Sequence, residues 1–316
     1  KSNYKFNRKK PIRLASISSA TGLINLFDEK YKGSLHVQTS ERFNGCDIIN
    51  EVFLEDYLAT LLPMEMNSRW PIEALKAQAV AARSYAFFKI STKQVSKSKG
   101  FKATYDLENS EKHQVNGSYF DATKKTMRAA KRTRGEVLTL DGVKTTPVFF
   151  HSKCGGKTLT PEQVWKNKVP GYKSVPCPFC HKHGREDWIH RFKKNKVKRH
   201  MASALKGYSK NRTNIDDDLV TLYGDSKASA QLKVGLNGLS RSLKKSRLRS
   251  KMGRKALPSN YYNLKVRGED IIVSGSGYGH GVGMCQFGAK ELALQGFSYK
   301  QILAHYFPKL KLVKIY

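Results

Sequence analysis

The chain has 316 residues, enough for one large domain or two modest ones, and its hydrophobic fraction of 39% supports a packed core. Its 58 Lys and Arg against 25 Asp and Glu give a net charge of +33, which favours polyanionic partners: nucleic acid, acidic membrane surfaces or cell-wall polymers. No apolar run is long enough to span a bilayer, so we expect no transmembrane segment, and the chain starts at Lys1 without a leader-like segment.

The first part of the chain predicts a basic arm, short strands and a helix pair. Residues 1–35 begin as a polar, basic arm and continue with the pattern of short strands. A short helix closed by Pro63 follows, and a turn that holds Glu65 leads into an alanine-rich second helix. Arg83 lies on a face that looks along the second helix towards this turn. We therefore expect a helix pair over residues 54–90.

The later part of the chain predicts further strands and a terminal helix. An amphipathic helix over 121–133 precedes two strands joined by a turn at Asp141. A last strand pair over 260–275 leads into a glycine-rich run, and a helix over 298–307 follows it. No internal repeat is evident.

The order of these elements predicts a mixed α+β fold. We expect a compact core over 36–187 and 256–316, with the helix pair and β hairpins in it. Much of the excess positive charge lies in residues 188–255, which we expect to form a basic inserted subdomain. A charge run of this kind is most often a solvated helical face, and the total charge is what favours a polyanionic partner.

Glu65 is the first candidate for chemistry. Its neighbours Pro63, Met64, Met66 and Trp70 are mostly apolar in character. A carboxylic acid among apolar groups has a raised pKa, which suits a proton donor near neutral pH. The local sequence also fits a glutamate that caps the start of the next helix, and both interpretations stay open at this point.

The glycine-rich run GSGYGHGVGMCQFGA is the second candidate. Its glycines recur with a period of two from Gly275 to Gly283, which does not match the spacing of a phosphate-binding loop. Alternating glycines let a backbone approach a ligand or a neighbouring strand closely. His280 within the run is either a groove residue or a structural histidine.

The cysteines suggest a metal site. There are five: Cys46, Cys154, Cys177, Cys180 and Cys285. Because an odd number does not make a disulfide framework, the CxxC pair at 177 and 180 predicts two thiolate ligands of one metal ion. The residues that complete the set are Cys154 and His151, with His181 and His183 as competing fourth ligands. The alternative is that the CxxC pair is a redox pair or a simple disulfide.

Three segments together resemble the SpoIID family, the stage II sporulation protein D group of peptidoglycan lytic transglycosylases and their amidase-enhancer relatives. The first, LEDYLATLLPMEMNSRWPIEALKAQAVAARSYA, is similar to the helix pair of the family. The others, FFHSKCGGKTLTPEQVW and GYGHGVGMCQFGAKELALQGFSYKQILAHYF, are similar to its second and third signature segments and follow in the same order. The resemblance runs from about Leu54 to Phe307.

The resemblance implies roles for the residues at matching positions. The catalytic acid of the family falls on Glu65 and its helix arginine on Arg83, whose guanidinium either holds Glu65 or binds a lactyl carboxylate of the substrate. It also implies a substrate groove, with these candidate residues: Tyr306, His280, Gln286, Tyr172 and Lys173. Tyr172 and Lys173 lie in GYKSV, which is one residue shorter than the corresponding family segment.

The resemblance further implies a cofactor, partners and a location. The CGG and CxxC arrangement is similar to a metal-bearing branch of the family, which implies a structural zinc and no organic cofactor. Cys285 replaces a serine of the family, and the sequence assigns it no role. The implied partners are peptidoglycan glycan strands and an amidase or other cell-wall enzymes, without nucleic acid, and the implied location is extracytoplasmic, in the periplasm or cell envelope.

The implied reaction is cleavage between N-acetylmuramic acid and N-acetylglucosamine in peptide-stripped strands. Glu65 protonates the linking oxygen and then acts as a base while the C6 hydroxyl closes a 1,6-anhydro ring. Ordinary glycosidases need two carboxylates, and no second carboxylate here has a motif of its own. Peptide-stripped strands expose carboxylates, which fits the positive charge of the chain.

Three alternatives remain at this point. A hydrolase, that is a two-carboxylate muramidase, would pair Glu65 with Asp56 or Glu73. A non-catalytic wall-binding protein would stimulate an amidase. A nucleic-acid binder is supported only by the basic regions, because the sequence has no RNP, zinc-finger or helix-turn-helix signature.

Overall fold

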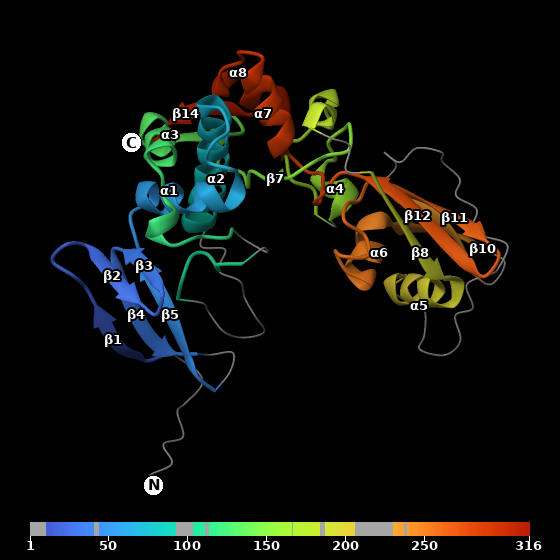
Figure 1. Cartoon of the computed structure of the whole chain (residues 1–316), viewed down its shortest axis with the longest axis horizontal. Coiled ribbons are helices and arrows are strands. Elements are labelled where there is room, and N and C mark those ends of the chain that lie inside the picture. Colours follow the sequence, from blue (N-terminus) through green and yellow to red (C-terminus); the bar gives the residue numbers. More distant parts are fainter. Residues whose placement is uncertain are drawn as a thin grey trace, which may run out of the picture. The chain divides into compact units, whose positions relative to one another are not determined.

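The structure is a computed structural model that describes residues 11–40, 44–92, 104–110, 114–165, 167–183, 187–205, 230–236 and 239–316. Helices alternate with small sheets, which confirms the predicted mixed α+β fold (Figure 1). The chain divides into two compact units: unit 1 is Lys1–Val148 with Lys311–Tyr316, and unit 2 is Phe149–Leu310. Residues 1–10 of the predicted arm and 206–229 of the predicted insertion lie outside the described residues. The division into a core and an insertion stays a prediction.

Short strands form the N-terminal part of unit 1, as predicted. An antiparallel sheet has the strand order β1 (Arg13–Ile17), β4 (Ser34–Thr39) and β5 (Cys46–Glu51), and β2 (Leu23–Leu26) forms a hairpin with β3 (Glu29–Lys32). Leu35 in the central strand β4 is completely buried, whereas the edge strand β1 is exposed along its whole length.

Three helices pack together in unit 1: α1 (Leu54–Glu65), α2 (Ile72–Thr92) and α3 (Lys124–Arg132). The predicted helix pair is therefore confirmed, with one difference. Pro63 does not close α1, which continues for two more residues and ends where the Met66 N–H donates to the Leu62 carbonyl at 2.9 Å. A proline in the last turn removes one hydrogen bond from a ladder that is about to end, so the helix tolerates it.

The end of the chain returns to unit 1. The strand β6 (Glu136–Thr139) pairs antiparallel with β14 (Lys311–Lys314). The predicted turn after β6 is confirmed, because Asp141 Oδ1 accepts hydrogen bonds from the N–H groups of Val143 and Lys144 at 3.0 and 2.8 Å. The ladder partner of β6 is nevertheless β14, and the segment that follows the turn meets β6 at an isolated antiparallel bridge between Thr139 and Thr145.

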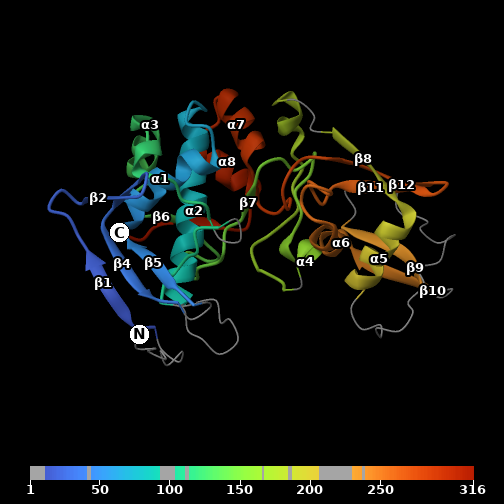
Figure 2. The same ribbon diagram turned by 60° about the horizontal axis from the view of Figure 1, so that its bottom comes forward.

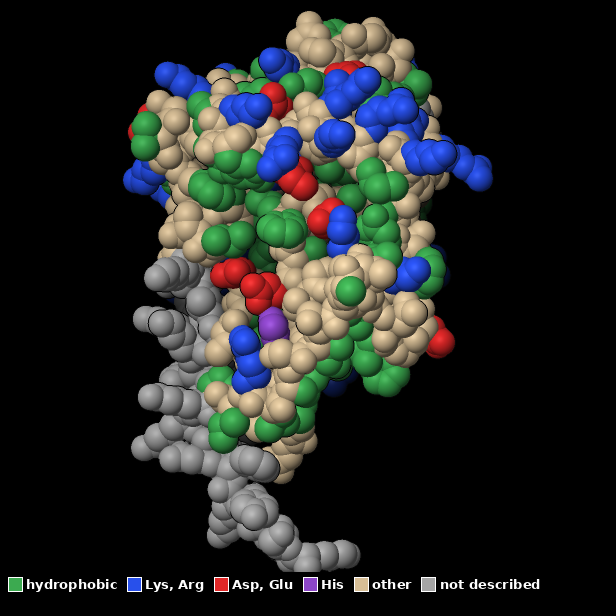
Figure 3. Space-filling view, turned by 90° about the vertical axis from the view of Figure 1, so that its left-hand side faces the viewer, with side chains coloured by type: hydrophobic (Ala, Val, Ile, Leu, Met, Phe, Trp, Pro, Cys, Tyr) green, Lys and Arg blue, Asp and Glu red, His purple; other side chains and the backbone are tan. Residues whose placement is uncertain are grey.

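The surface of unit 1 mixes charges of both signs. On the side drawn in Figure 3, Lys and Arg side chains lie among Asp, Glu and hydrophobic side chains. Lys32 pairs with Asp56 at 2.7 Å, and Lys76 pairs with Glu73 at 2.6 Å. Positive charge on this unit is therefore partly offset by acidic neighbours.

In one part of unit 2, the loops around Lys153, Pro176 and Tyr278 interleave through isolated β-bridges. The strand β7 (Phe150–His151) runs parallel to β13 (Met284–Cys285). The helical elements around them are α4 (Pro161–Val164), η2 (Pro178–His183), α7 (Gln286–Leu294) and α8 (Tyr299–Tyr306). The predicted C-terminal helix is confirmed by α8.

The glycine-rich run makes this interleaving possible. Gly277 and Gly283 have φ values of +79° and +75°, a backbone region that disfavours other residues. A Cβ atom at Gly283 would lie 2.0 Å from the Phe149 carbonyl oxygen, and one at Gly277 would lie 2.6 Å from the Lys153 carbonyl oxygen. The run therefore approaches the backbone of a neighbouring segment, which is one of the two uses that its glycines predicted.

The remainder of unit 2 has its own hydrophobic core, and we call it the basic module (residues 187–205, 230–236 and 239–276). Its sheet has the order β11 (Tyr262–Arg267), β12 (Asp270–Ser276) and β8 (Asp187–Lys193), and β9 (Gln231–Leu236) pairs with β10 (Leu239–Lys244). The helices α5 (Lys194–Ala204) and α6 (Lys245–Met252) lie side by side (Figures 1 and 2). The predicted strand pair over 260–275 is confirmed by β11 and β12.

None of the helices in the described part of the chain is both long and apolar enough to cross a membrane.

Candidate active site and metal centre

Glu65 is the last residue of α1, half-buried, and it begins the turn that leads into α2. One hydrogen bond within the turn and one from α3 hold it in place. Asn67 Oδ1 accepts from the Arg69 N–H at 2.9 Å, and the Arg69 carbonyl accepts from Lys125 Nζ of α3 at 3.1 Å. Met66, the next residue, is 2% exposed. The Glu65 carboxylate therefore lies at the end of a helix that is held in place, and the next residue in the chain, Met66, is buried and apolar.

Arg83 is completely buried in α2, and its guanidinium is surrounded by acceptors. Its Nε and Nη2 groups donate to the two carboxylate oxygens of Glu55 at 2.9 and 2.7 Å, which makes a bidentate ion pair. Further bonds of 3.1 to 3.4 Å reach the carbonyls of Ala130 and Glu136 and the Thr133 hydroxyl. This Arg83 lock joins α2 to the start of α1, the end of α3 and β6.

The lock changes the interpretation of Arg83. A completely buried guanidinium does not reach a substrate, so binding of a lactyl carboxylate does not fit its position. Its carboxylate partner is Glu55 and not Glu65, so any effect on Glu65 passes through helix α1, whose two ends carry these residues. Sequence reasoning missed Glu55 because a glutamate in a first turn is common for its effect on the helix dipole alone.

Two tyrosines extend the polar network around α1. Tyr316 Oη donates to Glu55 Oε1 at 2.8 Å, and Tyr57 Oη donates to Gln114 Oε1 at 2.9 Å. Burial raises the pKa of Tyr57, and the negative charge of Glu65 adds to this rise. Tyr57 is therefore a protonated hydroxyl within electrostatic reach of Glu65, and no sequence motif drew attention to it.

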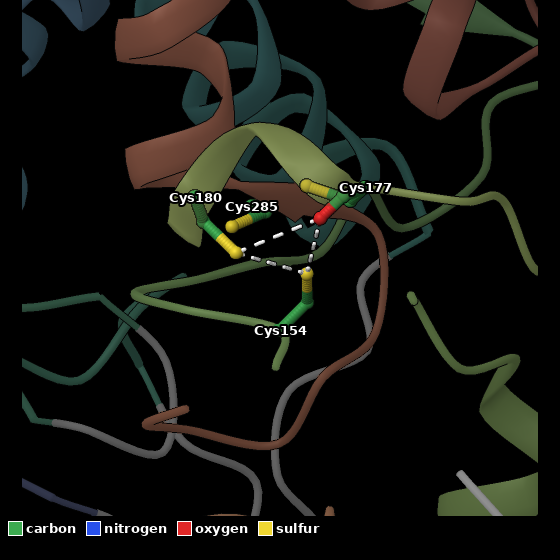
Figure 4. A group of neighbouring side chains, drawn as sticks. All are labelled: Cys154, Cys177, Cys180 and Cys285. Atoms are coloured by element: carbon green, nitrogen blue, oxygen red, sulfur yellow. Dashed lines mark hydrogen bonds between the residues drawn. The ribbon is translucent and has the colours of Figure 1, made fainter. Parts of the chain in front are cut away.

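Four cysteines from three segments of the chain form a buried cluster in unit 2 (Figure 4): Cys154, the pair Cys177 and Cys180, and Cys285. Their Sγ atoms all lie within 4.8 Å of one another, and those of Cys154 and Cys180 are 3.7 Å apart. Burial, together with the neighbouring thiols, raises the pKa of Cys285 well above its usual value. A divalent cation ionises buried thiols by binding their sulfurs, so this cysteine cluster is a set of residues able to hold a metal ion.

Groups around the cluster fix its sulfurs. The Gly156 N–H donates to Cys154 Sγ and the Gly288 N–H donates to Cys285 Sγ, both at 3.4 Å. A Cβ atom at Gly288 would lie 2.6 Å from Cys177 Sγ and 2.0 Å from Tyr306 Oη. Glycine at the start of α7 is therefore what allows the helix to close over the cluster.

The fourth sulfur corrects the predicted ligand set. His151 was expected as the fourth ligand, but it lies outside the cluster, and its Nδ1 is 3.0 Å from the Val282 carbonyl oxygen. Cys285 stands in its place, supplied by β13, which runs beside His151 in β7. His181 is not among the four residues, and the side chain of His183 lies outside the described part of the chain. The sequence did contain a signal for this fourth cysteine, because Cys285 stands where the family that the chain resembles has a serine.

Tyr306 also has a different position from the one expected. It is 1% exposed, and its hydroxyl lies 3.1 Å from Cys177 Sγ. A buried hydroxyl against a sulfur supports the cysteine cluster and offers no surface to a glycan. Of the remaining groove candidates, Gln286 is buried at the start of α7 and Lys173 is exposed.

His280 and Tyr172 lie close together in unit 2, around Phe149. The Tyr172 hydroxyl accepts from the Phe149 N–H at 2.9 Å, and the ring centroids of Phe149 and His280 are 6.4 Å apart. Trp165, which is 37% exposed, has its ring 5.2 Å from His280. These two candidates therefore share an aromatic group with Trp165, to which the sequence assigned no role.

The profile of the family described as SpoIID, stage II sporulation protein, matches residues 42–140, a range that contains both Glu65 and Arg83. An uncharacterized protein of Brachyspira hyodysenteriae is 32% identical over 267 residues, which are 84% of this chain and 68% of that protein.

Two Bacillus subtilis proteins are also similar to the chain. Stage II sporulation protein D is 28% identical, with 82% of this chain and 74% of that protein aligned. The amidase enhancer is 27% identical over 92% of this chain, which spans only 45% of the length of the enhancer.

Proposed function

Because the chain belongs to the SpoIID family, we propose that it is a peptidoglycan lytic transglycosylase that acts on peptide-stripped glycan strands. The observation that carries the proposal is Glu65, a half-buried carboxylate at the fixed end of α1 within the matched family segment. In this proposal Glu65 protonates the oxygen that links N-acetylmuramic acid to N-acetylglucosamine. It then takes the proton of the C6 hydroxyl as that oxygen closes the 1,6-anhydro ring.

The positions of other carboxylates favour one acid over two. Asp56 and Glu65 are nine residues apart in α1, which corresponds to roughly 13 Å of rise and about half a turn of rotation, so they face opposite sides of the helix. The carboxyl groups of two-acid glycosidases are closer, about 5 to 9.5 Å apart. Asp56 also pairs with Lys32 at 2.7 Å, and Glu73 pairs with Lys76 at 2.6 Å. These pairs support transglycosylation over hydrolysis.

Arg83 acts in this proposal as a positioning residue. Its bidentate pair with Glu55 fixes the start of α1 against α2, and Glu65 is at the other end of the same rigid helix. The segment around Asn116 adds to this support, because Thr60 Oγ1 donates to Asn116 Oδ1 at 2.6 Å from the middle of α1. The acid is thus held by secondary structure and not by a direct ion pair with Arg83.

The proposed cofactor is one structural zinc ion in the cysteine cluster. Zinc–thiolate bonds of about 2.3 Å in a tetrahedron place sulfurs about 3.8 Å apart. The 3.7 Å between Cys154 and Cys180, and the 4.8 Å limit for all four sulfurs, fit that requirement. Bound there, the metal would ionise the thiols and cross-link the loops of unit 2 with η2 and α7, and four protein ligands would leave no position for chemistry.

The proposed surroundings follow from the substrate. Removal of stem peptides leaves one carboxylate per disaccharide, which turns the strand into a polyanion that a chain of net charge +33 attracts. We propose an extracytoplasmic location for this reason, with cell-wall enzymes such as an amidase as partners that strip the strand.

The test is muropeptide analysis of sacculi from which an amidase has removed the peptides. The wild-type protein should release fragments with 1,6-anhydro ends, and Glu65→Gln should lower the rate by roughly a hundred-fold or more while the protein stays folded. Glu73→Gln is the matched control, because it removes the same charge from the start of α2 and should leave the rate within a few-fold.

The rival functions give other results in the same assay. Products with ordinary reducing ends, together with a large loss in Asp56→Asn or Glu73→Gln, would indicate a two-carboxylate hydrolase. Stimulation of an amidase that Glu65→Gln leaves intact, without any release of fragments, would indicate a non-catalytic amidase enhancer.

A further inference from the structure

A strand-to-helix corner occurs twice in the basic module. At the end of β8 the sequence is Phe192-Lys-Lys-Asn-Lys-Val-Lys198, and at the end of β10 it is Leu243-Lys-Lys-Ser-Arg-Leu-Arg249. Each pair of aligned residues over these seven positions is identical or of the same chemical type, and Met201 aligns with Met252 after two pairs that differ, Arg199 with Ser250 and His200 with Lys251. No internal repeat was expected from the sequence, because the corners are separated by unrelated segments and are too short to stand out.

The two corners also have the same geometry. The residues before the helices, Lys193 and Lys244, have φ and ψ of −62°, 134° and −64°, 129°. Val197 and Leu248 occupy equivalent positions and are both completely buried in the core of the module. The repeat is therefore structural: two neighbouring helices enter the module through the same turn and present equivalent faces.

The equivalent exposed faces are basic. Lys196 and Arg247 occupy the same position in α5 and α6, and both are exposed. A second exposed cation lies about one turn further along each helix, Arg199 three residues on in α5 and Lys251 four residues on in α6, although these two residues are one position apart in the alignment. Like charges at these spacings destabilise a helix by a few tenths of a kcal/mol per pair. A bound polyanion would offset this cost on both helices.

The module offers few internal anions. Its described residues contain seventeen Lys and Arg against three acids, Asp187, Glu269 and Asp270. Asp270 already lies 3.1 Å from Lys193 and 4.0 Å from Arg191. Neither α5 nor α6 contains an acidic residue, so neither has a carboxylate to complement its dipole. This contrasts with unit 1, whose face in Figure 3 mixes both signs.

We propose that the basic module is a non-catalytic binding site for the polyanionic, peptide-stripped glycan strand, with the paired faces of α5 and α6 as its contact surface. The inference rests on the proposed function for the identity of the strand. A glycan with regularly spaced carboxylates suits the exposed cations that recur on these two adjacent helices. It would be held by charge, without a pocket for any one sugar.

The surface chemistry favours a glycan over single-stranded nucleic acid. Proteins that bind single strands of nucleic acid stack the bases on exposed aromatic rings. The helices α5 and α6 contain no Phe, Tyr or Trp. Elsewhere in the described part of the module, Trp188, Phe192 and Tyr262 are packed into or against the hydrophobic core, and the Tyr261 ring lies beside Gly155. The exposed face of the paired helices therefore carries cations without rings for stacking.

The experiment compares two four-residue variants in the full chain, both in a Glu65→Gln background so that the strand is not cut. The module variant replaces four exposed cations with Gln: Lys196, Arg199, Arg247 and Lys251. The control variant makes the same change at four exposed cations of unit 1: Lys124, Arg128, Lys131 and Lys144. Both lower the net charge by four, so a general charge effect weakens them equally. Binding to fluorescently labelled, amidase-treated glycan strands is measured from low to physiological salt.

The expected result is a loss of affinity of roughly ten-fold for the module variant and about two-fold for the control, with a shallower salt dependence for the module variant. Equal losses in the two variants overturn the inference, as does the absence of glycan binding by the parent protein. Tighter binding of a DNA duplex than of the glycan at physiological salt also overturns it, in favour of a nucleic-acid surface.

Failure of the proposed function is distinguishable from failure of this inference. If the protein with Glu65 intact releases no anhydro fragments but the two variants still differ in glycan affinity, the binding site stands and the transglycosylase proposal falls. If fragments are released but the two variants bind the glycan alike, the transglycosylase proposal stands and the proposed binding site falls.

Discussion

The two units bury ionisable groups in opposite ways. In unit 1 the Arg83 lock places a completely buried cation against the Glu55 carboxylate and three further acceptors, so the charge is satisfied within the protein. In unit 2 the cysteine cluster brings four thiols together, and burial raises the pKa of Cys285 well above its usual value. The first arrangement is complete with the residues of the chain, whereas the second would gain stability from a bound cation, as proposed above.

This difference shows how each unit holds its candidate functional residues in place, Glu65 in unit 1 and the cysteine cluster in unit 2. A satisfied ion pair between helices makes α1 and α2 a rigid platform for Glu65 without any cofactor. The interleaved loops of unit 2 have little regular structure, and a metal would supply the cross-links that longer strands provide elsewhere. The helix pair should therefore resist chelators, and the loops should not.

The largest expected effect is on metal binding by unit 2. Purified protein should contain one equivalent of zinc by elemental analysis, and Cys285→Ala should remove most of it. Structural zinc sites contribute of the order of 10 kcal/mol to folding, so a strong chelator should lower the unfolding temperature by many degrees.

The control for the metal prediction is His151→Ala, at the residue that the sequence favoured as fourth ligand. If this variant loses the zinc while Cys285→Ala keeps it, the assignment of Cys285 is wrong. Circular dichroism of the helices in chelator then separates loss of unit 2 from unfolding of the whole chain.

The second effect concerns the Arg83 lock. Arg83→Lys keeps the charge but cannot reproduce the bidentate pair with Glu55, and it leaves buried acceptors without donors, so the free energy of unfolding should fall by roughly 2–4 kcal/mol. The measurement is urea unfolding of the metal-loaded protein. Arg128→Lys, at an exposed position of α3, should change it by less than about 0.5 kcal/mol. An equally small change for Arg83→Lys would show that the lock is not structural.

The third effect tests a buried cation in unit 2. Lys245 is 1% exposed, its Nζ lies 5.2 Å from the centre of the Tyr262 ring, and burial lowers its pKa to about 8. The unfolded chain binds this proton up to about pH 10.5, so between pH 8 and 10.5 the unfolded state holds more protons, and stability contributed by this site rises with pH. Below pH 8 the site costs the folded state up to about 3 kcal/mol.

Lys245→Met should therefore stabilise the protein at pH 7, by as much as about 3 kcal/mol, with a gain that shrinks towards pH 10.5. Urea unfolding at the two pH values measures the effect, and the exposed Lys251→Met is the control. A loss of stability that is the same at both pH values would indicate that the lysine is held by contacts that outweigh its desolvation.

Local sequence determined much of the secondary structure. The alanine-rich run gave α2, the alternation of apolar residues over 260–275 gave β11 and β12, and the turn at Asp141 follows from its side chain accepting two backbone N–H groups. These features depend on neighbours a few residues apart. The end of α1 is the exception, because its last turn continued past Pro63.

The candidate site was only partly visible in the sequence. The family resemblance marked Glu65, Arg83 and three of the four clustered cysteines by position. It marked neither Glu55 as the partner of Arg83 nor Cys285 as the fourth member of the cluster. It also placed Tyr306 in a groove, where the structure has it buried against a sulfur.

The reason lies in what each level of structure specifies. The sequence by itself determined the net charge, the family resemblance and four of the helices (α1, α2, α3 and α8), because these depend on composition and on short-range patterns. Only the tertiary structure decided the partners, because Arg83 meets a carboxylate 28 residues away and Cys177 meets a hydroxyl 129 residues away. Buried polar groups take whichever partners the packing of distant segments brings within hydrogen-bonding distance, and no local pattern records that choice.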